Sequence, residues 1–137
     1  YSSSLDRVNV DLAIDIPVVN LLSDVSHPLQ AIADLLTIRA EFGPELSGRI
    51  LTWVGDYSNV ARSLALAASM QGMEVRFACP DRYAPTAEDL DLFTRTGSPA
   101  VRSGANPVTE VTGSHVVVTD AWYSMGQEAE AAQRRPI

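Results

Sequence analysis

The amino-acid sequence predicts an α/β fold in which helices cover a parallel sheet. Two observations lead to this prediction. Short runs of apolar and β-branched residues, at residues 50–54, 75–78 and 116–119, alternate with stretches of helical character. The connections between these elements are short, and alternation of strands and helices through short connections is typical of a parallel sheet.

The composition is that of a globular protein with one domain or parts of two. The chain has 137 residues, of which 46% are hydrophobic and 20% are charged. A net charge of -7 and scattered basic residues argue against a nucleic-acid partner, because binding to phosphates needs clustered basic side chains. No apolar run is long enough for a membrane span and no signal peptide is visible, so we expect no membrane partner. The single cysteine agrees with a reducing, cytoplasmic location.

The first third of the chain contains one expected strand and one expected helix. Residues 16–22 are apolar and β-branched, which predicts a buried strand. A helix is expected over residues 28–42, because proline suits its first turn and Gly43-Pro44 ends it. Apolar side chains surround most of this helix, so we expect it to be buried on more than one side, in a core or between two domains. A narrow polar stripe interrupts them and consists of Gln30, Asp34, Thr37 and Glu41.

Two further helices are expected between the strands. The first covers residues 59–71, is rich in alanine and ends at Gly72. The second begins near Thr86, where acidic residues follow in the first turn. Both helices fit crossover connections between parallel strands.

Three loops carry the candidate functional residues. Ligands of parallel sheets bind at the carboxyl ends of the strands, and these loops follow expected strands. They span residues 23–27, 55–59 and 120–126. This placement alone nominates four side chains, His27, Asn59, Asp120 and Ser124.

The first two loops also have ordinary structural interpretations. His27 and Gln30 fit a pair that binds a carbonyl and an amide, but composition alone favours a surface histidine and a solvated glutamine. The second loop opens a helix whose N-terminus attracts anions, yet Ser58 or Asn59 fits a plain N-cap equally well. A dinucleotide fingerprint needs three glycines, and only Gly55 is present.

The third loop is the richest in unlike functional groups. Asp120 and Ser124 lie four residues apart and suit an ammonium group, whereas the ordinary interpretation is an Asx-type turn with aromatic packing. His115 fits a surface position and Cys79 fits a buried structural thiol. The sequence has no His/Cys cluster with metal-ligand spacing and no serine nucleophile motif, so we expect neither a metal nor a cofactor.

Taken together, these segments resemble the ornithine carbamoyltransferases. The motifs occur in the order and approximate spacing of that family and cover nearly the whole chain. The His-Pro-x-Gln motif is shared with aspartate carbamoyltransferases, whereas the Asp-x-x-x-Ser-Met-Gly loop is more specific to the ornithine branch. The matching stretches are residues 16–20, 22–24, 27–38, 55–56, 59–61, 72–75 and 118–128.

The resemblance implies a carbamoyl transfer that needs no cofactor. Carbamoyl phosphate and L-ornithine give L-citrulline and phosphate, in arginine metabolism. By resemblance, His27 is the catalytic residue that donates to the carbamoyl oxygen, and Gln30 binds the carbamoyl amide. Asp120 and Ser124 match the pair that binds the α-amino end, Asn59 the residue that holds the carboxylate, and Met125 contributes through its backbone. The expected ornithine-binding residues are thus Asn59, Asp120, Ser124 and Met125.

The resemblance also implies two domains and a trimer. Residues 1–42 are expected to be the end of a carbamoyl-phosphate domain with the helix that crosses between domains. Residues 43–137 are expected to form an incomplete, Rossmann-like ornithine-binding domain. The family's Ser-Thr-Arg-Thr and His-Cys-Leu-Pro loops have no counterpart here, and Ser58 stands where many relatives have asparagine. Because sites of this family also borrow residues from a neighbouring subunit of a homotrimer, we expect this chain alone to be inactive.

Other functions stay open at this point. The acceptor amine could be aspartate or putrescine instead of ornithine. The chain could also be a non-catalytic ligand-binding or interaction domain derived from the enzyme, or a dinucleotide-binding module, which the missing glycines disfavour.

Overall fold

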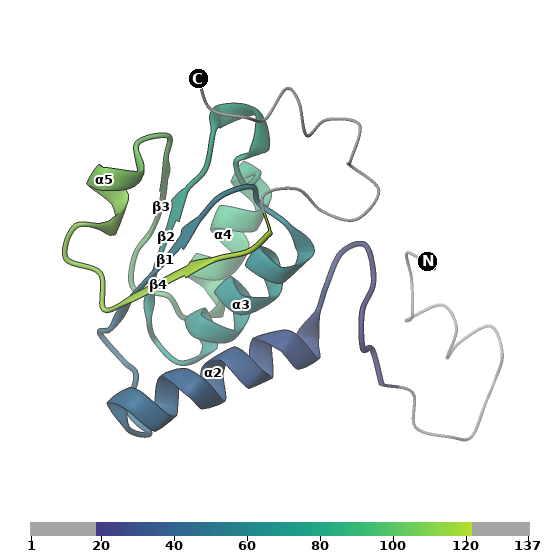
Figure 1. The fold of residues 1–137 in the computed structure, drawn as a ribbon, viewed down its shortest axis with the longest axis vertical. Helices are drawn as coiled ribbons and strands as arrows, with labels where there is room; N and C mark the ends of the chain where they lie inside the picture. The colour runs from purple at the N-terminus through teal and green to yellow at the C-terminus, as the bar shows by residue number, and fades with distance from the viewer. Residues whose placement is uncertain (1–18, 122–137) are drawn as a thin grey trace, which may run out of the picture.

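A parallel sheet forms the centre of the structure, a computed structural model that describes residues 19–121 (Figure 1). Within these residues the sheet has four strands in the order β3-β2-β1-β4, and every pair of neighbours is parallel. The strands are β1 (Ile50–Val54), β2 (Glu74–Ala78), β3 (Val101–Gly104) and β4 (Val116–Thr119). The predicted α/β class with a parallel sheet is therefore confirmed.

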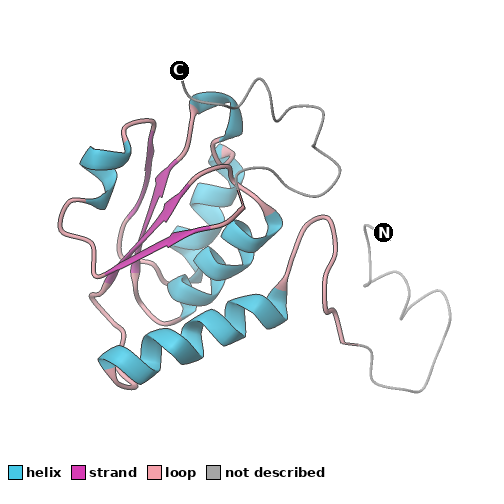
Figure 2. Cartoon of the chain, in the orientation of Figure 1, coloured by secondary structure: helices cyan, strands magenta, loops and turns pink. Residues whose placement is uncertain are grey.

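Helices cover both faces of this sheet (Figure 2). One face carries α3 (Asn59–Met70) and α4 (Ala87–Thr96), and the other carries the short α5 (Pro107–Val111). The first described helix, α2 (Pro28–Phe42), packs against α3, and a 3-10 turn, η1 (Asp81–Tyr83), follows β2. The expected helices and strands that match these elements agree with them to within one residue. None of the described helices is long and apolar enough to cross a membrane.

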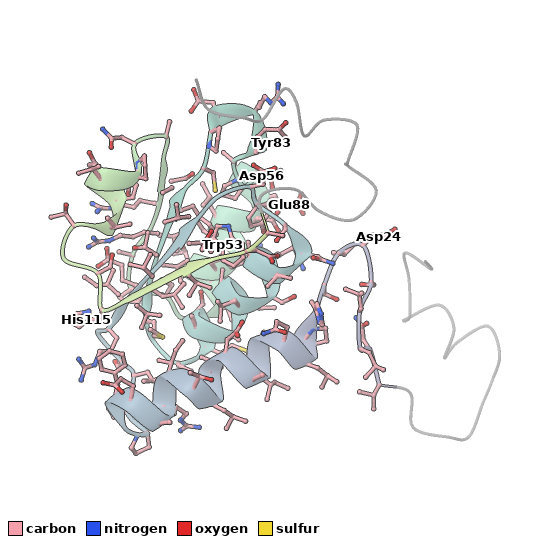
Figure 3. The ribbon with its side chains drawn as sticks, in the orientation of Figure 1. Asp24, Trp53, Asp56, Tyr83, Glu88 and His115 are labelled. Carbon is pink, nitrogen blue, oxygen red and sulfur yellow. The ribbon has the colours of Figure 1, made fainter. Side chains whose placement is uncertain are left out.

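The two faces of the sheet differ in polarity, because side chains alternate along each strand. Trp53 and Phe77 are partners in the register, and Phe77 lies 5.7 Å from the ring of Phe93 on α4. This apolar face holds the core, with Trp53 at its centre (Figure 3). Thr52 and Arg76, also partners, face the other side, where Arg76 donates to main-chain carbonyls at the end of α5.

The sequence does not predict β3 or α5. β3 is a four-residue edge strand whose central residues, Arg102 and Ser103, are polar and exposed, so it lacks the apolar run that marks the other strands. The sequence does contain a typical helix start for α5. Asn106 accepts hydrogen bonds from two N–H groups of its first turn, and Pro107 stands at its first position.

The expected strand at residues 16–22 is wrong in its described part. Residues 16–18 lie outside the described residues, and residues 19–22 form no strand. A strand is stable only when a neighbour satisfies its backbone N–H and C=O groups. None of the described strands pairs with this segment, and Val19 and Leu21 are exposed.

The described residues bury α2 on one side. Ala31 and Ile38 are buried in the core that α2 shares with α3. Leu29, Ile32 and Leu36 are 44%, 53% and 63% exposed. Nothing within residues 19–121 covers these three side chains, so burial of this second side, between two domains, stays a prediction.

We predict that Gly97→Ala destabilises the protein more than Gly113→Ala does. Both glycines have a positive φ, +131° and +78°, which disfavours a side chain. A Cβ at Gly97 would also lie 2.9 Å from the carbonyl oxygen of Ser69, whereas nothing lies within 4 Å at Gly113. The expected losses of unfolding free energy are roughly 2–4 kcal/mol for Gly97→Ala and about 1 kcal/mol for Gly113→Ala. Urea denaturation measures both, and equal losses would contradict the role of the backbone contact.

Candidate functional site

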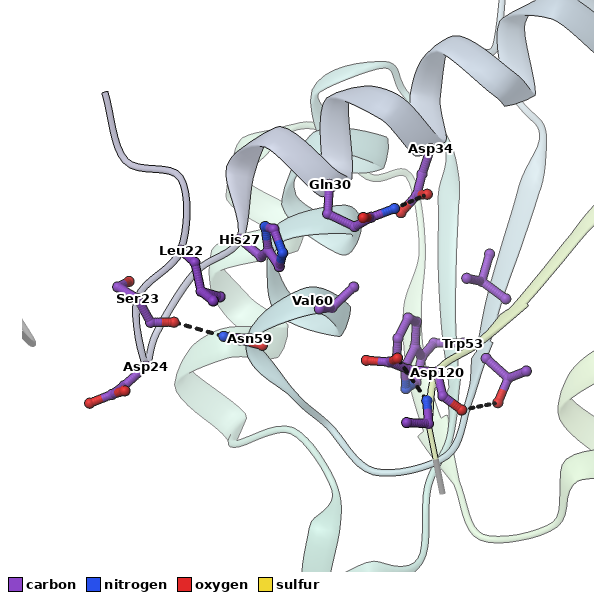
Figure 4. Close-up of a pocket in the computed structure, with 13 residues that line it drawn as sticks. Leu22, Ser23, Asp24, His27, Gln30, Asp34, Trp53, Asn59, Val60 and Asp120 are labelled. Carbon is purple, nitrogen blue, oxygen red and sulfur yellow. Dashed lines mark hydrogen bonds between the residues drawn. The ribbon is translucent and has the colours of Figure 1, made fainter. Parts of the chain in front are cut away.

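A cavity of about 610 Å³ lies at the carboxyl ends of β1 and β4 (Figure 4). His27 and Gln30 stand on its α2 side, and Trp53 and Asp120 stand on the side of the strands. All three loops that the sequence nominates contribute to it. The lining residues are Leu22, Ser23, Asp24, His27, Gln30, Asp34, Trp53, Asn59, Val60, Val118, Thr119, Asp120 and Ala121.

The cavity brings together the predicted site residues that the structure describes. His27, Gln30, Asn59 and Asp120 all line it. Ser124 and Met125 lie outside the described residues. The cavity lies beyond the carboxyl ends of the strands, where ligands of parallel sheets usually bind.

Hydrogen bonds fix the 23–27 loop to the first turns of α3. Asn59 donates from Nδ2 to the carbonyl oxygen of Ser23 at 2.7 Å. The main-chain N–H of His27 donates to Oγ of Ser63 at 2.8 Å. The loop is also closed on itself, because the N–H of Ser23 donates to the carbonyl oxygen of Ser26. The position of this cavity wall is thus set by α3.

His27 is the N-cap residue of α2, and its side chain lines the cavity. The imidazole makes no capping hydrogen bond, so it is not engaged with the N–H groups at the start of α2. Its Nδ1 is buried and has no hydrogen-bond partner among the described residues. A buried polar atom without a partner is unusual in a folded protein, and a ligand in the cavity would supply one.

Asp34 orients the carboxamide of Gln30. Nε2 of Gln30 donates to Oδ1 of Asp34 at 2.9 Å, one helical turn away (Figure 4). Because a carboxylate accepts only from the NH₂ end of the amide, the carbonyl Oε1 of Gln30 stays available as an acceptor. Asp34 is not among the site residues predicted from the sequence. Its position four residues after Gln30 in the polar stripe does indicate that the two side chains can contact each other.

Asp120 follows β4 directly and places a carboxylate at the strand side of the cavity. Its Oδ1 accepts the main-chain N–H of Ala121 at 2.7 Å. This turn-like contact leaves further lone pairs for a ligand. Asp24 and Asp34 also line the cavity, and no arginine is among its described lining residues. The negative charge favours a ligand with an ammonium group.

The loop between β1 and α3 is held by a cap and a partly buried polar cluster. Ser58 is the N-cap of α3 and accepts the N–H of Ala61, as one of the two predicted alternatives requires. Burial, reinforced by the Asp89 carboxylate, raises the pKa of the Tyr57 hydroxyl far above its ordinary value. Asp89 pairs with Arg62 at 3.0 Å and so joins α4 to α3. The start of α3 is therefore a fixed platform for the cavity.

Cys79 and His115 do not line the cavity. Cys79 is buried, as predicted, and burial, followed by the nearby Asp56, raises the pKa of its thiol to about 12. His115 is exposed before β4, and its Nδ1 accepts the N–H of Ile50 at 3.0 Å. Within residues 19–121, no three His, Cys, Asp or Glu side chains are grouped so that they could hold a metal ion.

Comparison with known proteins decides the family. The profile of "Aspartate/ornithine carbamoyltransferase, Asp/Orn binding domain" matches residues 47–137. The chain belongs to the aspartate/ornithine carbamoyltransferase family. This membership confirms the resemblance seen in the sequence.

Relatives within this family are named ornithine carbamoyltransferases. The protein of Clavibacter sepedonicus is 49% identical over 123 residues, which cover 87% of this chain and 40% of that protein. The protein of Prochlorococcus marinus is 40% identical over 124 residues, which cover 89% of this chain and 39% of that protein. The solved structure of the Pyrococcus furiosus enzyme superposes with a TM-score of 0.81 at 38% identity, covering 95% of this chain and 42% of that one. The chain thus spans about two fifths of the length of these carbamoyltransferases.

We predict that Cys79 resists alkylation in the folded protein. With a thiol pKa of about 12, only about one molecule in 10⁴ is a thiolate at pH 8, and burial blocks the reagent as well. Iodoacetamide at pH 8 should therefore leave the peptide that contains Cys79 unmodified, as read by mass spectrometry, and should modify it fully in urea. Rapid modification of the folded protein would contradict the inert structural role.

Proposed function

We propose that the protein containing this chain transfers the carbamoyl group of carbamoyl phosphate to the δ-amine of L-ornithine, which gives L-citrulline and phosphate. The single observation that carries the proposal is the cavity that combines His27, Gln30, Asn59 and Asp120. The relatives described above are ornithine carbamoyltransferases, which supports this acceptor.

The α2 side of the cavity suits the carbamoyl group. As the amine attacks the carbamoyl carbon, the carbonyl oxygen gains negative charge, and a fixed hydrogen-bond donor lowers the barrier. His27 supplies that donor from a partly buried imidazole whose Nδ1 is buried and has no described protein partner. Gln30 accepts from the carbamoyl NH₂ through Oε1, because Asp34 occupies its own NH₂ end.

Asp120 at the strand side of the cavity and Asn59 at the start of α3 suit the amino-acid end of ornithine. Asp120 pairs with the α-ammonium group, together with Ser124 and the backbone of Met125, and Asn59 donates to the α-carboxylate. Nδ2 of Asn59 carries two hydrogens, of which one is used by the carbonyl oxygen of Ser23. Three carboxylates line the described part of the cavity, and they repel the second carboxylate of aspartate. Putrescine has no carboxylate that could accept a hydrogen bond from Asn59.

We further propose the expected domain arrangement, with residues 1–42 ending a carbamoyl-phosphate domain and 43–137 forming most of the ornithine-binding domain. The family profile begins at residue 47, which supports the boundary. The exposed apolar face of α2, formed by Leu29, Ile32 and Leu36, suits packing against the preceding domain. No arginine is among the described residues that line the cavity. The phosphate is therefore held by residues outside 19–121 or by a neighbouring subunit. The whole protein is a cytoplasmic homotrimer and acts in arginine metabolism.

We predict that the whole protein carbamoylates ornithine with a kcat/KM at least about 100-fold above that for aspartate or putrescine. The reason is that each competitor either adds a repelled carboxylate or leaves Asn59 without a partner. Citrulline formation and phosphate release, measured for each amine, check this preference. Equal or faster use of aspartate or putrescine would assign another acceptor, and no turnover with any amine would favour a non-catalytic domain.

We predict that Asp120→Asn lowers kcat/KM for ornithine but leaves the binding of carbamoyl phosphate unchanged. Asparagine keeps the turn contact to Ala121 but removes the charge-assisted bond to the ammonium, which is worth roughly 1.5–3 kcal/mol. kcat/KM for ornithine should fall roughly 10- to 150-fold while KM for carbamoyl phosphate stays within about twofold.

The matched control for this prediction is Asp91→Asn. Asp91 lies on α4, pairs with Arg95 at 3.1 Å and does not line the cavity. Its substitution should leave both substrates unaffected. An Asp120→Asn protein that melts like the wild type and shows wild-type ornithine kinetics would exclude the proposed role.

A further inference from the structure

The main-chain N–H of His27 is held by a hydroxyl group of another helix, while its carbonyl oxygen accepts the N–H of Ala31 in the first turn of α2. The N–H of His27 donates to Oγ of Ser63 at 2.8 Å, across 36 residues of sequence. The imidazole has no comparable anchor among the described residues, because it makes no capping bond and its Nδ1 is unpartnered. The direction of the imidazole therefore depends on the main chain of His27, and Ser63 is the described contact from another helix that fixes it.

Ser63 serves two partners at once. It lies in the second turn of α3, is only 8% exposed, and donates its one hydrogen to the carbonyl oxygen of Asn59 at 2.8 Å. Its lone pairs are then free to accept from His27. Because Asn59 also donates from its side chain to Ser23, a continuous hydrogen-bonded unit connects Asn59 to both ends of the 23–27 loop.

We infer that Ser63 is a positioning residue of the site: its hydroxyl sets the place of the His27 imidazole relative to Asn59. The inference rests on the proposed function, in which His27 serves the carbamoyl group and Asn59 serves ornithine. Two reacting groups must be held in attack geometry, and a displacement of about 1 Å can cost about 100-fold in rate. Ser63 joins the residue that serves one substrate to the residue that serves the other.

The same helix provides a matched control in Ser69. Ser69 is fully buried and donates to the carbonyl oxygen of Ala65 at 2.8 Å, the same bond to the fourth preceding residue that Ser63 makes to Asn59. The hydrogen bond of the Ser69 hydroxyl stays within α3, whereas the hydroxyl of Ser63 also contacts His27, the N-cap residue of α2. Ser69→Ala therefore reproduces the effect on the helix without the effect on His27.

The test compares Ser63→Ala, Ser63→Thr and Ser69→Ala in the whole protein. Ser63→Ala should lower kcat by about 10- to 100-fold and change KM for ornithine by less than about threefold, because His27 acts in the transition state. Threonine retains the hydroxyl and makes the same bond within helices, so Ser63→Thr should recover kcat to within about threefold of the wild type. Ser69→Ala should stay within about twofold.

Wild-type kcat in a folded Ser63→Ala protein, a loss equal to that of Ser69→Ala, or a folded Ser63→Thr protein as slow as Ser63→Ala would each overturn the inference. Should Ser63→Ala fail to fold, Ser63→Cys replaces it, since a thiol is of similar size but a weak acceptor. A folded Ser63→Cys protein should show the same loss of kcat, and wild-type kcat there would overturn the inference.

A second readout separates this inference from the proposed function. Hydrogen exchange at the His27 amide should be faster in Ser63→Ala than in both the wild type and Ser69→Ala, whatever reaction the protein performs. If the wild type makes no citrulline, the proposed function fails and this measurement alone decides on Ser63. Equal exchange rates in Ser63→Ala and Ser69→Ala would overturn the positioning role.

Discussion

The hydrogen bonds between the start of α3 and the 23–27 loop hold the cavity together. The described residues bury α2 on one side, where it packs against α3. Asn59 and Ser63 add directional hydrogen bonds to this packing, because each bonds a main-chain group of the loop before α2. Each partly buried bond contributes on the order of 1 kcal/mol, and leaving its donor unpaired costs more. The cavity therefore exists because two polar side chains on one helix fix the backbone of a distant loop.

That anchoring brings two chemically different walls face to face. The α2 wall offers the imidazole of His27 and the carbonyl oxygen of Gln30, and the carboxylate of Asp34 orients the Gln30 amide. The strand wall offers the carboxylate of Asp120 at the end of β4. An uncharged carbamoyl group suits the first wall and an ammonium group suits the second. The proposed function uses this separation, with the carbamoyl group at one wall and the ammonium group at the other.

The sequence predicts well those features that are encoded locally. Short, mostly apolar and β-branched runs mark β1, β2 and β4. Capping residues and glycines mark the ends of α3 and α4, and the strand-end rule locates the cavity. β3 is missed because a short polar edge strand owes its existence to pairing with β2 and not to its own residues. The strand predicted at residues 19–22 is wrong for the opposite reason. Its residues are apolar, but they have no described partner strand and so form no strand. Ser63 has no local signal, because its contact with His27 spans 36 residues.

The most direct test of the account is a crystal structure of the whole protein with a stable mimic that joins carbamoyl phosphate to ornithine. The account predicts that the mimic fills the cavity at the ends of β1 and β4. Its carbamoyl oxygen should lie within hydrogen-bond distance of the His27 imidazole and its α-ammonium group should lie against Asp120, with the Ser63–His27 bond intact. A mimic bound away from this cavity, or bound with its amino-acid end at His27 and its carbamoyl end at Asp120, would contradict it.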